Sequence, residues 1–66
     1  MKSEKFLQTA TSMLAEEFIR LGNFSAEVAT ELSNKVIPTI DWDNEAIMHK
    51  GFGWIAKTYM RYNMSA

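Results

Sequence analysis

The sequence predicts an all-α domain, a small three-helix bundle in which a long C-terminal helix packs across the first two. Apolar residues recur at intervals of three and four along most of the 66 residues, which is the period of helices buried on one side. Gly22 and Pro38 interrupt this period and divide it into three stretches. The single domain spans 1–66, and its helices are expected at about 3–21, 25–37 and 43–63.

The first expected helix begins at Ser3, because a serine side chain can accept a hydrogen bond from the free N–H groups of a first turn. Gly22-Asn23 is expected to end it, with glycine in the left-handed conformation that commonly follows a helix. Its apolar side comprises Phe6, Leu7, Ala10, Met13, Leu14, Phe18 and Leu21.

Glu17 lies inside this apolar side and is the one charged residue there. A carboxylate in such a place is solvated at the edge of the apolar side, is paired with a cation, or is a catalytic acid. We prefer these interpretations in that order. The expected partners for a pairing are cations of the last helix, namely Lys50, Lys57 and Arg61.

The second expected helix begins at Ser25, and Glu27 suits the positive end of its dipole. Pro38 ends it, because proline disfavours helical backbone at the residue before it. Residues 36–40 are then expected to form an extended apolar connection. The narrow apolar side of this helix comprises Val28, Ala29, Leu32 and Val36.

Residues 41–45, Asp-Trp-Asp-Asn-Glu, predict the start of the last helix, because their side chains suit a helix N-terminus. Gly51 and Gly53 each cost about 1 kcal/mol relative to alanine in a helix. We nevertheless expect one helix, kinked or straight, because the apolar pattern keeps its phase across both glycines; two shorter helices, 43–50 and 54–63, are the alternative. The apolar side comprises Ile47, Met48, Gly51, Phe52, Trp54, Ile55, Tyr59 and Tyr62.

A second face of this helix recurs in steps of 4, 3, 4, 3 and 4, the spacing of a coiled-coil seam. Small side chains near its middle would let another backbone approach closely, so this face is a candidate partner interface. The plainer interpretation is that the helix is the central helix of its own bundle. The residues of this face are Trp42, Ala46, His49, Gly53, Ala56 and Met60.

Charge is divided unevenly along the chain. Residues 1–49 hold four Lys or Arg and eight Asp or Glu, a charge of −4, whereas residues 50–66 hold three Lys or Arg and no acid, a charge of +3. Such polarity favours head-to-tail association or an anionic partner. Lys50, Lys57 and Arg61 are the candidate contacts for an anionic partner, although Arg61 also suits the negative end of its own helix.

No catalytic, cofactor-binding or metal site is predicted. The chain has no cysteine, one histidine and no glycine-rich phosphate loop, so it offers neither a nucleophile motif nor a structural metal site. Glu45 and His49 are four residues apart and Asp41 and Asp43 are close, but this spacing matches no metal motif. We therefore expect no enzyme and no cofactor.

Residues 25–33, Ser-Ala-Glu-Val-Ala-Thr-Glu-Leu-Ser, resemble the first helix of the helix-turn-helix family, which often reads Val-Ala-x-x-Leu-Gly. The resemblance implies a DNA-binding regulator. It covers about nine residues, and the next segment, residues 36–41, is apolar, interrupted by proline and then acidic. An acidic surface repels phosphate, so this interpretation ranks second.

By elimination we expect a small protein–protein interaction module that uses its C-terminal helix. It would be an adaptor, regulator or inhibitor of a larger protein, or a self-associating subunit; a helix-turn-helix-like DNA-binding regulator is the alternative. Chains of this length bury only about 60% of their unfolded surface, which favours a homo-oligomer. No apolar run is long enough to span a membrane, and a chain without cysteine suits a reducing compartment, so a cytoplasmic location is expected.

Overall fold

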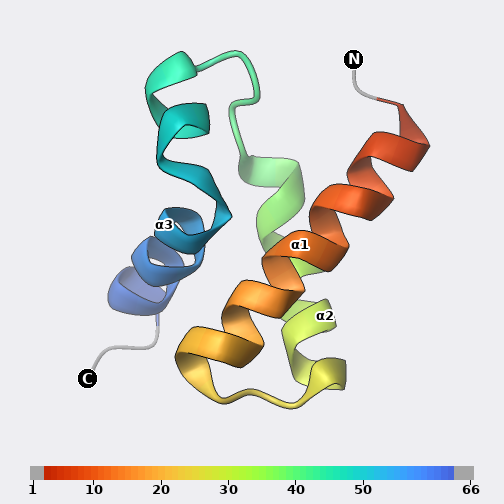
Figure 1. The fold of residues 1–66 in the computed structure, drawn as a ribbon, viewed down its shortest axis with the longest axis vertical. Coiled ribbons are helices and arrows are strands. Elements are labelled where there is room, and N and C mark those ends of the chain that lie inside the picture. Colours follow the sequence, from red (N-terminus) through yellow and green to blue (C-terminus); the bar gives the residue numbers. More distant parts are fainter. Residues whose placement is uncertain (1–2, 64–66) are drawn as a thin grey trace.

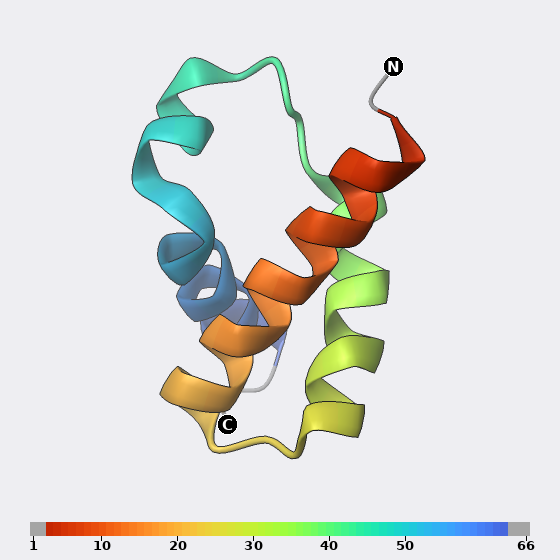
Figure 2. The same cartoon turned by 45° about the vertical axis from the view of Figure 1, so that its right-hand side comes forward.

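Three α-helices form the domain, as the sequence predicts. The computed structural model describes residues 3–63, in which α1 spans Glu4–Gly22, α2 spans Ala26–Val36 and α3 spans Glu45–Asn63. A 3-10 turn, η1, occupies Ile37–Thr39, and the described residues contain no strand. Helix α1 lies between the other two and packs against both, as Figures 1 and 2 show. The predicted all-α three-helix bundle is confirmed.

Serine caps fix where the first two helices begin. The Ser3 hydroxyl accepts a hydrogen bond from the Phe6 N–H at 3.1 Å, and the Ser25 hydroxyl accepts one from the Val28 N–H at 3.2 Å. Helix α1 ends one residue later than expected, because Asn23, not Gly22, takes the left-handed conformation with φ 57°. Asparagine tolerates this conformation better than most residues, and its N–H donates to the Ile19 carbonyl at 3.1 Å.

The connection between α2 and α3 is only partly extended. Residues 37–39 form η1, whereas Ile40 is extended with ψ 131°. Pro38 lies in the first turn of η1, where the N–H that proline lacks needs no partner. Asn44 then begins α3, because its side-chain oxygen accepts from the N–H groups of Ala46 at 3.0 Å and Ile47 at 3.3 Å.

Gly51 divides α3 into two segments. Its backbone has φ 80° and ψ 178°, far from helical values, so the helix changes direction there (Figure 1). This region of backbone conformation is open essentially to glycine alone. Of the two forms expected for a single helix, kinked or straight, the structure has the kinked one, but the apolar pattern does not keep one phase across the kink.

The core is built on the side of α1 that faces α2 and α3. Phe18 is fully buried at its centre, with its ring edge-on to Phe24 at 6.1 Å and to Tyr59 at 5.8 Å between centroids. Buried Ser33 donates from its hydroxyl to the Ala29 carbonyl at 2.8 Å. The buried apolar residues are Ala10, Leu14, Ala15, Phe18, Ala29, Leu32, Val36, Ile37, Ile55 and Ala56.

Glu17 is half-buried and pairs with Arg20 of its own helix, one turn away. The expected pairing with Lys50, Lys57 or Arg61 of α3 is not formed. The pair is local because the Arg20 side chain follows Glu17 by three residues on the same face of α1.

Within residues 3–63, no helix has the length and apolar character needed to cross a membrane.

Candidate functional site

The second half of the expected partner face lies against α1. Ala56 is fully buried in the core. A Cβ added at Gly53 would lie 3.0 Å from Oε1 of Glu17, and a Cβ added at Gly22 would lie 2.9 Å from Sδ of Met60. These three positions of α3 therefore make the contact between α3 and α1 inside the monomer. This half of the face packs within its own bundle, although the central helix of that bundle is α1 and not α3.

The first half of the same face is separated from the second by the kink. Trp42 precedes α3 and is half-buried, with its ring edge-on to Phe6 at 5.1 Å and to Phe52 at 6.3 Å. Ala46 and His49 are exposed in the first segment of α3. The structure therefore does not bring the six residues of the face together on one surface.

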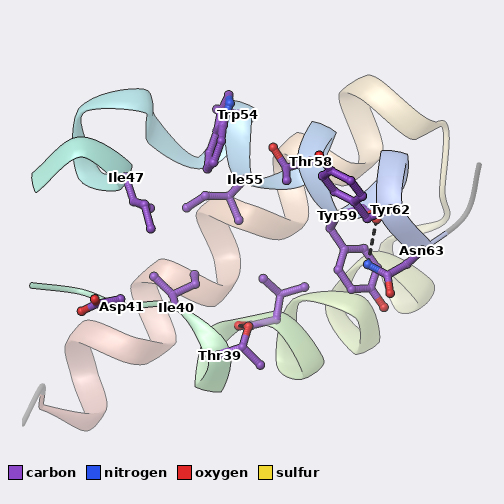
Figure 3. Close-up of a pocket in the computed structure, with 11 residues that line it drawn as sticks. Thr39, Ile40, Asp41, Ile47, Trp54, Ile55, Thr58, Tyr59, Tyr62 and Asn63 are labelled. Atoms are coloured by element: carbon purple, nitrogen blue, oxygen red, sulfur yellow. Dashed lines mark hydrogen bonds between the residues drawn. The ribbon is translucent and has the colours of Figure 1, made fainter. Parts of the chain in front are cut away.

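A different surface is hollowed and apolar. It is a groove between the second segment of α3 and the end of α2 with η1, and its volume is about 330 Å³ (Figure 3). Val36 and Ile55 are buried in it, and Ile40 and Ile55 point toward one another across it (Figure 3). The apolar residues of the groove are Val36, Ile40, Ile47, Trp54, Ile55, Tyr59 and Tyr62, and the polar ones are Thr39, Asp41, Thr58 and Asn63.

The groove exists because α1 holds its two walls apart. Helix α1 packs against α2 and against α3, and the connection through η1 and residues 40–44 spans the distance between them. In the second segment of α3, after the kink at Gly51, Trp54, Thr58 and Tyr62 line the groove. These three residues are four apart and so lie on one side of a helix.

Two aromatic side chains on the α3 wall are exposed to solvent, Tyr62 much more than Trp54. Trp54 is 39% exposed and Tyr62 is 77% exposed, although both line the groove. Tryptophan and tyrosine are enriched among the residues that dominate binding energy at protein interfaces. The α3 wall thus presents two aromatic rings at the edge of an apolar floor.

The polar groups of the groove are mostly engaged within the protein. The Thr39 hydroxyl donates to the Val36 carbonyl at 2.7 Å, and the Asn63 amide donates to the Tyr59 carbonyl at 3.0 Å (Figure 3). Asp41 lies at one end of the groove, and Asn63 lies at the opposite end (Figure 3). Thr39 and Thr58 lie between these two ends, among the apolar side chains that make up most of the lining (Figure 3).

The three cations of α3 are exposed beside the groove. Nζ of Lys50 lies 5.2 Å from the ring centroid of Trp54. Lys57 and Arg61 line a shallow hollow of about 300 Å³ together with Trp54 and Thr58, which also belong to the groove. The one ion pair within residues 3–63 is that of Arg20 with Glu17, so the expected anionic-partner contacts are not paired with acids of these residues.

His49 lies elsewhere, in an exposed hollow of about 420 Å³ that it shares with Glu45 and Met48. Across residues 3–63, no three His, Cys, Asp or Glu side chains converge in a way that could hold a metal ion. Of the acidic and histidine residues weighed in the sequence, Glu45 and His49 share this hollow, and Asp41 and Asp43 do not line it.

Sequence reasoning missed the groove because one of its walls comes from the end of α2 and the connection after it. Val36, Thr39 and Ile40 belong to α2, η1 and the extended residue after it, which the sequence presents as core or linker. Trp54 and Tyr62 were assigned to a core-facing stripe. Their spacing of four on either side of Thr58, together with nearby cations, was the available signal for an outward-facing wall.

The segment that resembles a helix-turn-helix is followed by a long connection. Eight residues, 37–44, separate α2 from α3, and they include η1. The helices of that motif are joined by a turn of about three to four residues.

Comparison of the chain with protein-family models, with curated proteins and with solved structures gave no match.

Proposed function

We propose that this protein is a small protein–protein interaction module, an adaptor, regulator or self-associating subunit, that docks a segment of another polypeptide in the groove between α3 and η1. The observation that carries the proposal is the apolar groove of about 330 Å³ with two exposed aromatic rings on its α3 wall. The surface of the C-terminal helix used for docking is the side with Trp54, Thr58 and Tyr62, in place of the side with Gly53, Ala56 and Met60.

The chemistry of the groove favours apolar side chains over a small polar molecule. Small-molecule sites combine apolar walls with a few convergent polar groups that fix the ligand. Here the Thr39 hydroxyl and the Asn63 amide donate to backbone carbonyls within the protein. Burying leucine-sized side chains against Val36, Ile40 and Ile55 would gain about 25 cal/mol per Å² of apolar surface removed from water.

A second copy of the chain is the alternative occupant of this groove, and it would use the same residues in place of a different protein. Small domains gain buried area by association.

We further propose that the protein works in the cytoplasm, since a chain without cysteine suits a reducing compartment.

A selection from a library of displayed helical peptides tests the proposal. Peptides are selected on the parent protein and then measured against Thr58→Trp, which fills the groove without changing the charge. Thr9→Trp is the matched control, because Thr9 is exposed on α1 and does not line the groove. We expect the selected peptides to bind at least about tenfold more weakly to Thr58→Trp, a loss of about 1.4 kcal/mol, and equally well to the control. Peptides that ignore Thr58→Trp would show that the groove is not the docking surface.

A further inference from the structure

We infer that the segment docked in the groove is an acidic amphipathic helix, with apolar side chains in the groove and carboxylates against Lys57 and Arg61. The inference rests on the proposed docking function and adds the chemistry of the partner. It depends on one arrangement. Lys57 and Arg61 form a basic strip beside the apolar groove, and Trp54 and Thr58 border both.

The basic strip gives the charge of the partner. Lys57 and Arg61 are both exposed, and the described part of α3 after Glu45 contains no acidic residue that could neutralise them. The one ion pair in residues 3–63 lies on α1, between Glu17 and Arg20. A segment in the groove would therefore place its solvent-facing edge beside two cations that form no ion pair within residues 3–63, and carboxylates on that edge would pair with them.

The residues at the two ends of the groove indicate the direction in which the partner helix runs. Asp41 lies at one end, while Tyr62 and Asn63, which directly follow Arg61 in the chain, lie at the other (Figure 3). A carboxylate favours the positive N-terminal end of a helix, and cations favour the negative C-terminal end. The docked helix is therefore oriented with its N-terminus toward Asp41 and its C-terminus toward Arg61.

The spacing of the groove residues fits a helical partner. Trp54, Thr58 and Tyr62 cover about 12 Å along α3 at 1.5 Å per residue, which is the length of about two turns of a docked helix. Helix-in-groove recognition uses apolar anchors at i, i+3 or i+4 and i+7. The described residues 3–63 form no strand, so they offer no sheet edge to which an extended segment could add.

The same observations disfavour a nucleic acid strand and a membrane surface. A base stacks on an open aromatic face, whereas one side of the Trp54 ring is occupied by Lys50 at 5.2 Å. Aliphatic walls such as Ile40 and Ile55 offer a base nothing to stack on. A membrane surface is entered by projecting apolar side chains, and here Ile55 is buried in a concave site.

The test uses two synthetic helical peptides of about 14 residues, close to four turns at 3.6 residues per turn. Both carry leucine at i, i+3, i+4, i+7 and i+8, and they differ only in the flanking residues, which are glutamate in one and lysine in the other. Binding to the whole protein is measured by calorimetry at about 50 mM and about 500 mM salt, where the Debye length falls from about 14 Å to about 4 Å. Circular dichroism confirms that every variant is folded.

We expect the glutamate peptide to bind at least about tenfold more tightly than the lysine peptide at low salt, and the ratio to shrink at high salt. Lys57→Glu and Arg61→Glu should each reduce this ratio about threefold or more. Lys5→Glu changes the net charge equally on exposed α1 and should leave the ratio unchanged. Thr58→Trp should remove binding of both peptides.

Other outcomes separate the two proposals. Equal binding of both peptides that is lost in Thr58→Trp would overturn the acidic partner and keep the docking function. Binding of neither peptide, or binding that ignores Thr58→Trp, would overturn both. The acidic-helix partner would also be overturned by tighter, Arg61-dependent binding of oligothymidine or of vesicles of equal phosphatidylserine and phosphatidylcholine. A homodimer that Thr58→Trp dissociates would overturn it too, because a second copy would then fill the groove.

Discussion

Gly53 of α3 lies against the carboxylate of Glu17 on α1. A Cβ added at Gly53 would be 3.0 Å from Oε1 of Glu17 and 3.9 Å from a guanidinium nitrogen of Arg20. The absence of a side chain at position 53 therefore lets α3 approach α1 closely at the Glu17–Arg20 pair. This contact belongs to the monomer, and it leaves the opposite side of α3, with Trp54, Thr58 and Tyr62, to line the groove.

Gly53→Leu is expected to lower the free energy of unfolding by about 1–3 kcal/mol, because a leucine side chain must displace the Glu17 carboxylate and separate α3 from α1. Gly53→Ala is the control. Its single methyl group needs a shift of a few tenths of an ångström by a flexible carboxylate and gains about 1 kcal/mol of helix propensity, so its net effect should stay within about 1 kcal/mol. Urea unfolding followed by circular dichroism measures both. A leucine variant as stable as the parent would show that position 53 does not face α1.

Gly51→Ala is expected to cost about 1–3 kcal/mol of stability through the backbone alone. The φ of 80° with ψ 178° is strained for any L-residue, yet no described heavy atom beyond its local neighbours would lie within 4 Å of an added Cβ. A d-alanine at position 51, introduced by chemical synthesis, also adds one methyl group, in place of the other Cα hydrogen, and prefers this backbone conformation. It should therefore keep the parent's stability. If d- and L-alanine were equally tolerated in thermal unfolding, α3 would not be kinked at Gly51.

Ser25→Ala is expected to destabilise the protein by about 1 kcal/mol, because the Val28 N–H loses the hydroxyl that accepts its hydrogen bond at 3.2 Å. Ser12→Ala is the matched control, since Ser12 is exposed in the middle of α1 and alanine is favourable there. The control should be neutral or slightly stabilising. Denaturant midpoints of the two variants give the comparison, and equal midpoints would contradict the cap at Ser25.

The two tryptophans should respond differently to a charged quencher. Trp54 is 39% exposed with Lys50 over its ring, whereas Trp42 is half-buried between Phe6 and Phe52. In Trp42→Phe, which leaves Trp54, iodide should quench fluorescence more strongly than in Trp54→Phe, because the ammonium group attracts the anion. Adding Lys50→Gln to Trp42→Phe should weaken iodide quenching and leave quenching by neutral acrylamide nearly unchanged. Equal quenching of the two single-tryptophan variants would contradict the exposure of Trp54.

The sequence predicted correctly those features that a single side chain determines, such as the start of a helix. The caps at Ser3 and Ser25 satisfy N–H groups three residues ahead, so they can be read from sequence alone. The position of the kink could not be read in this way. Gly51 and Gly53 have similar intrinsic costs, and the choice between them depends on how α3 packs against α1 after the turn.

The candidate site was harder to predict than the fold because its two walls are distant in sequence. Ala56 and Met60 share a seam-like spacing with His49, but the kink sends the later residues to the core and leaves His49 exposed. The groove needs Ile40 of the connection opposite Ile55 of α3, a pairing that only tertiary packing creates. Periodicity within one helix carries no information about such a pairing.

Photo-crosslinking in the cells that produce the protein tests the central claim, docking in the groove, most directly. A benzophenone amino acid is placed in turn at Trp54 and Tyr62 on the groove wall, and at exposed Thr9 and Glu31 away from it. The account predicts a discrete protein adduct from the two groove positions, none from the other two, and loss of the adduct when Thr58→Trp is added. Adducts that form equally from all four positions, or that persist with Thr58→Trp, would contradict it.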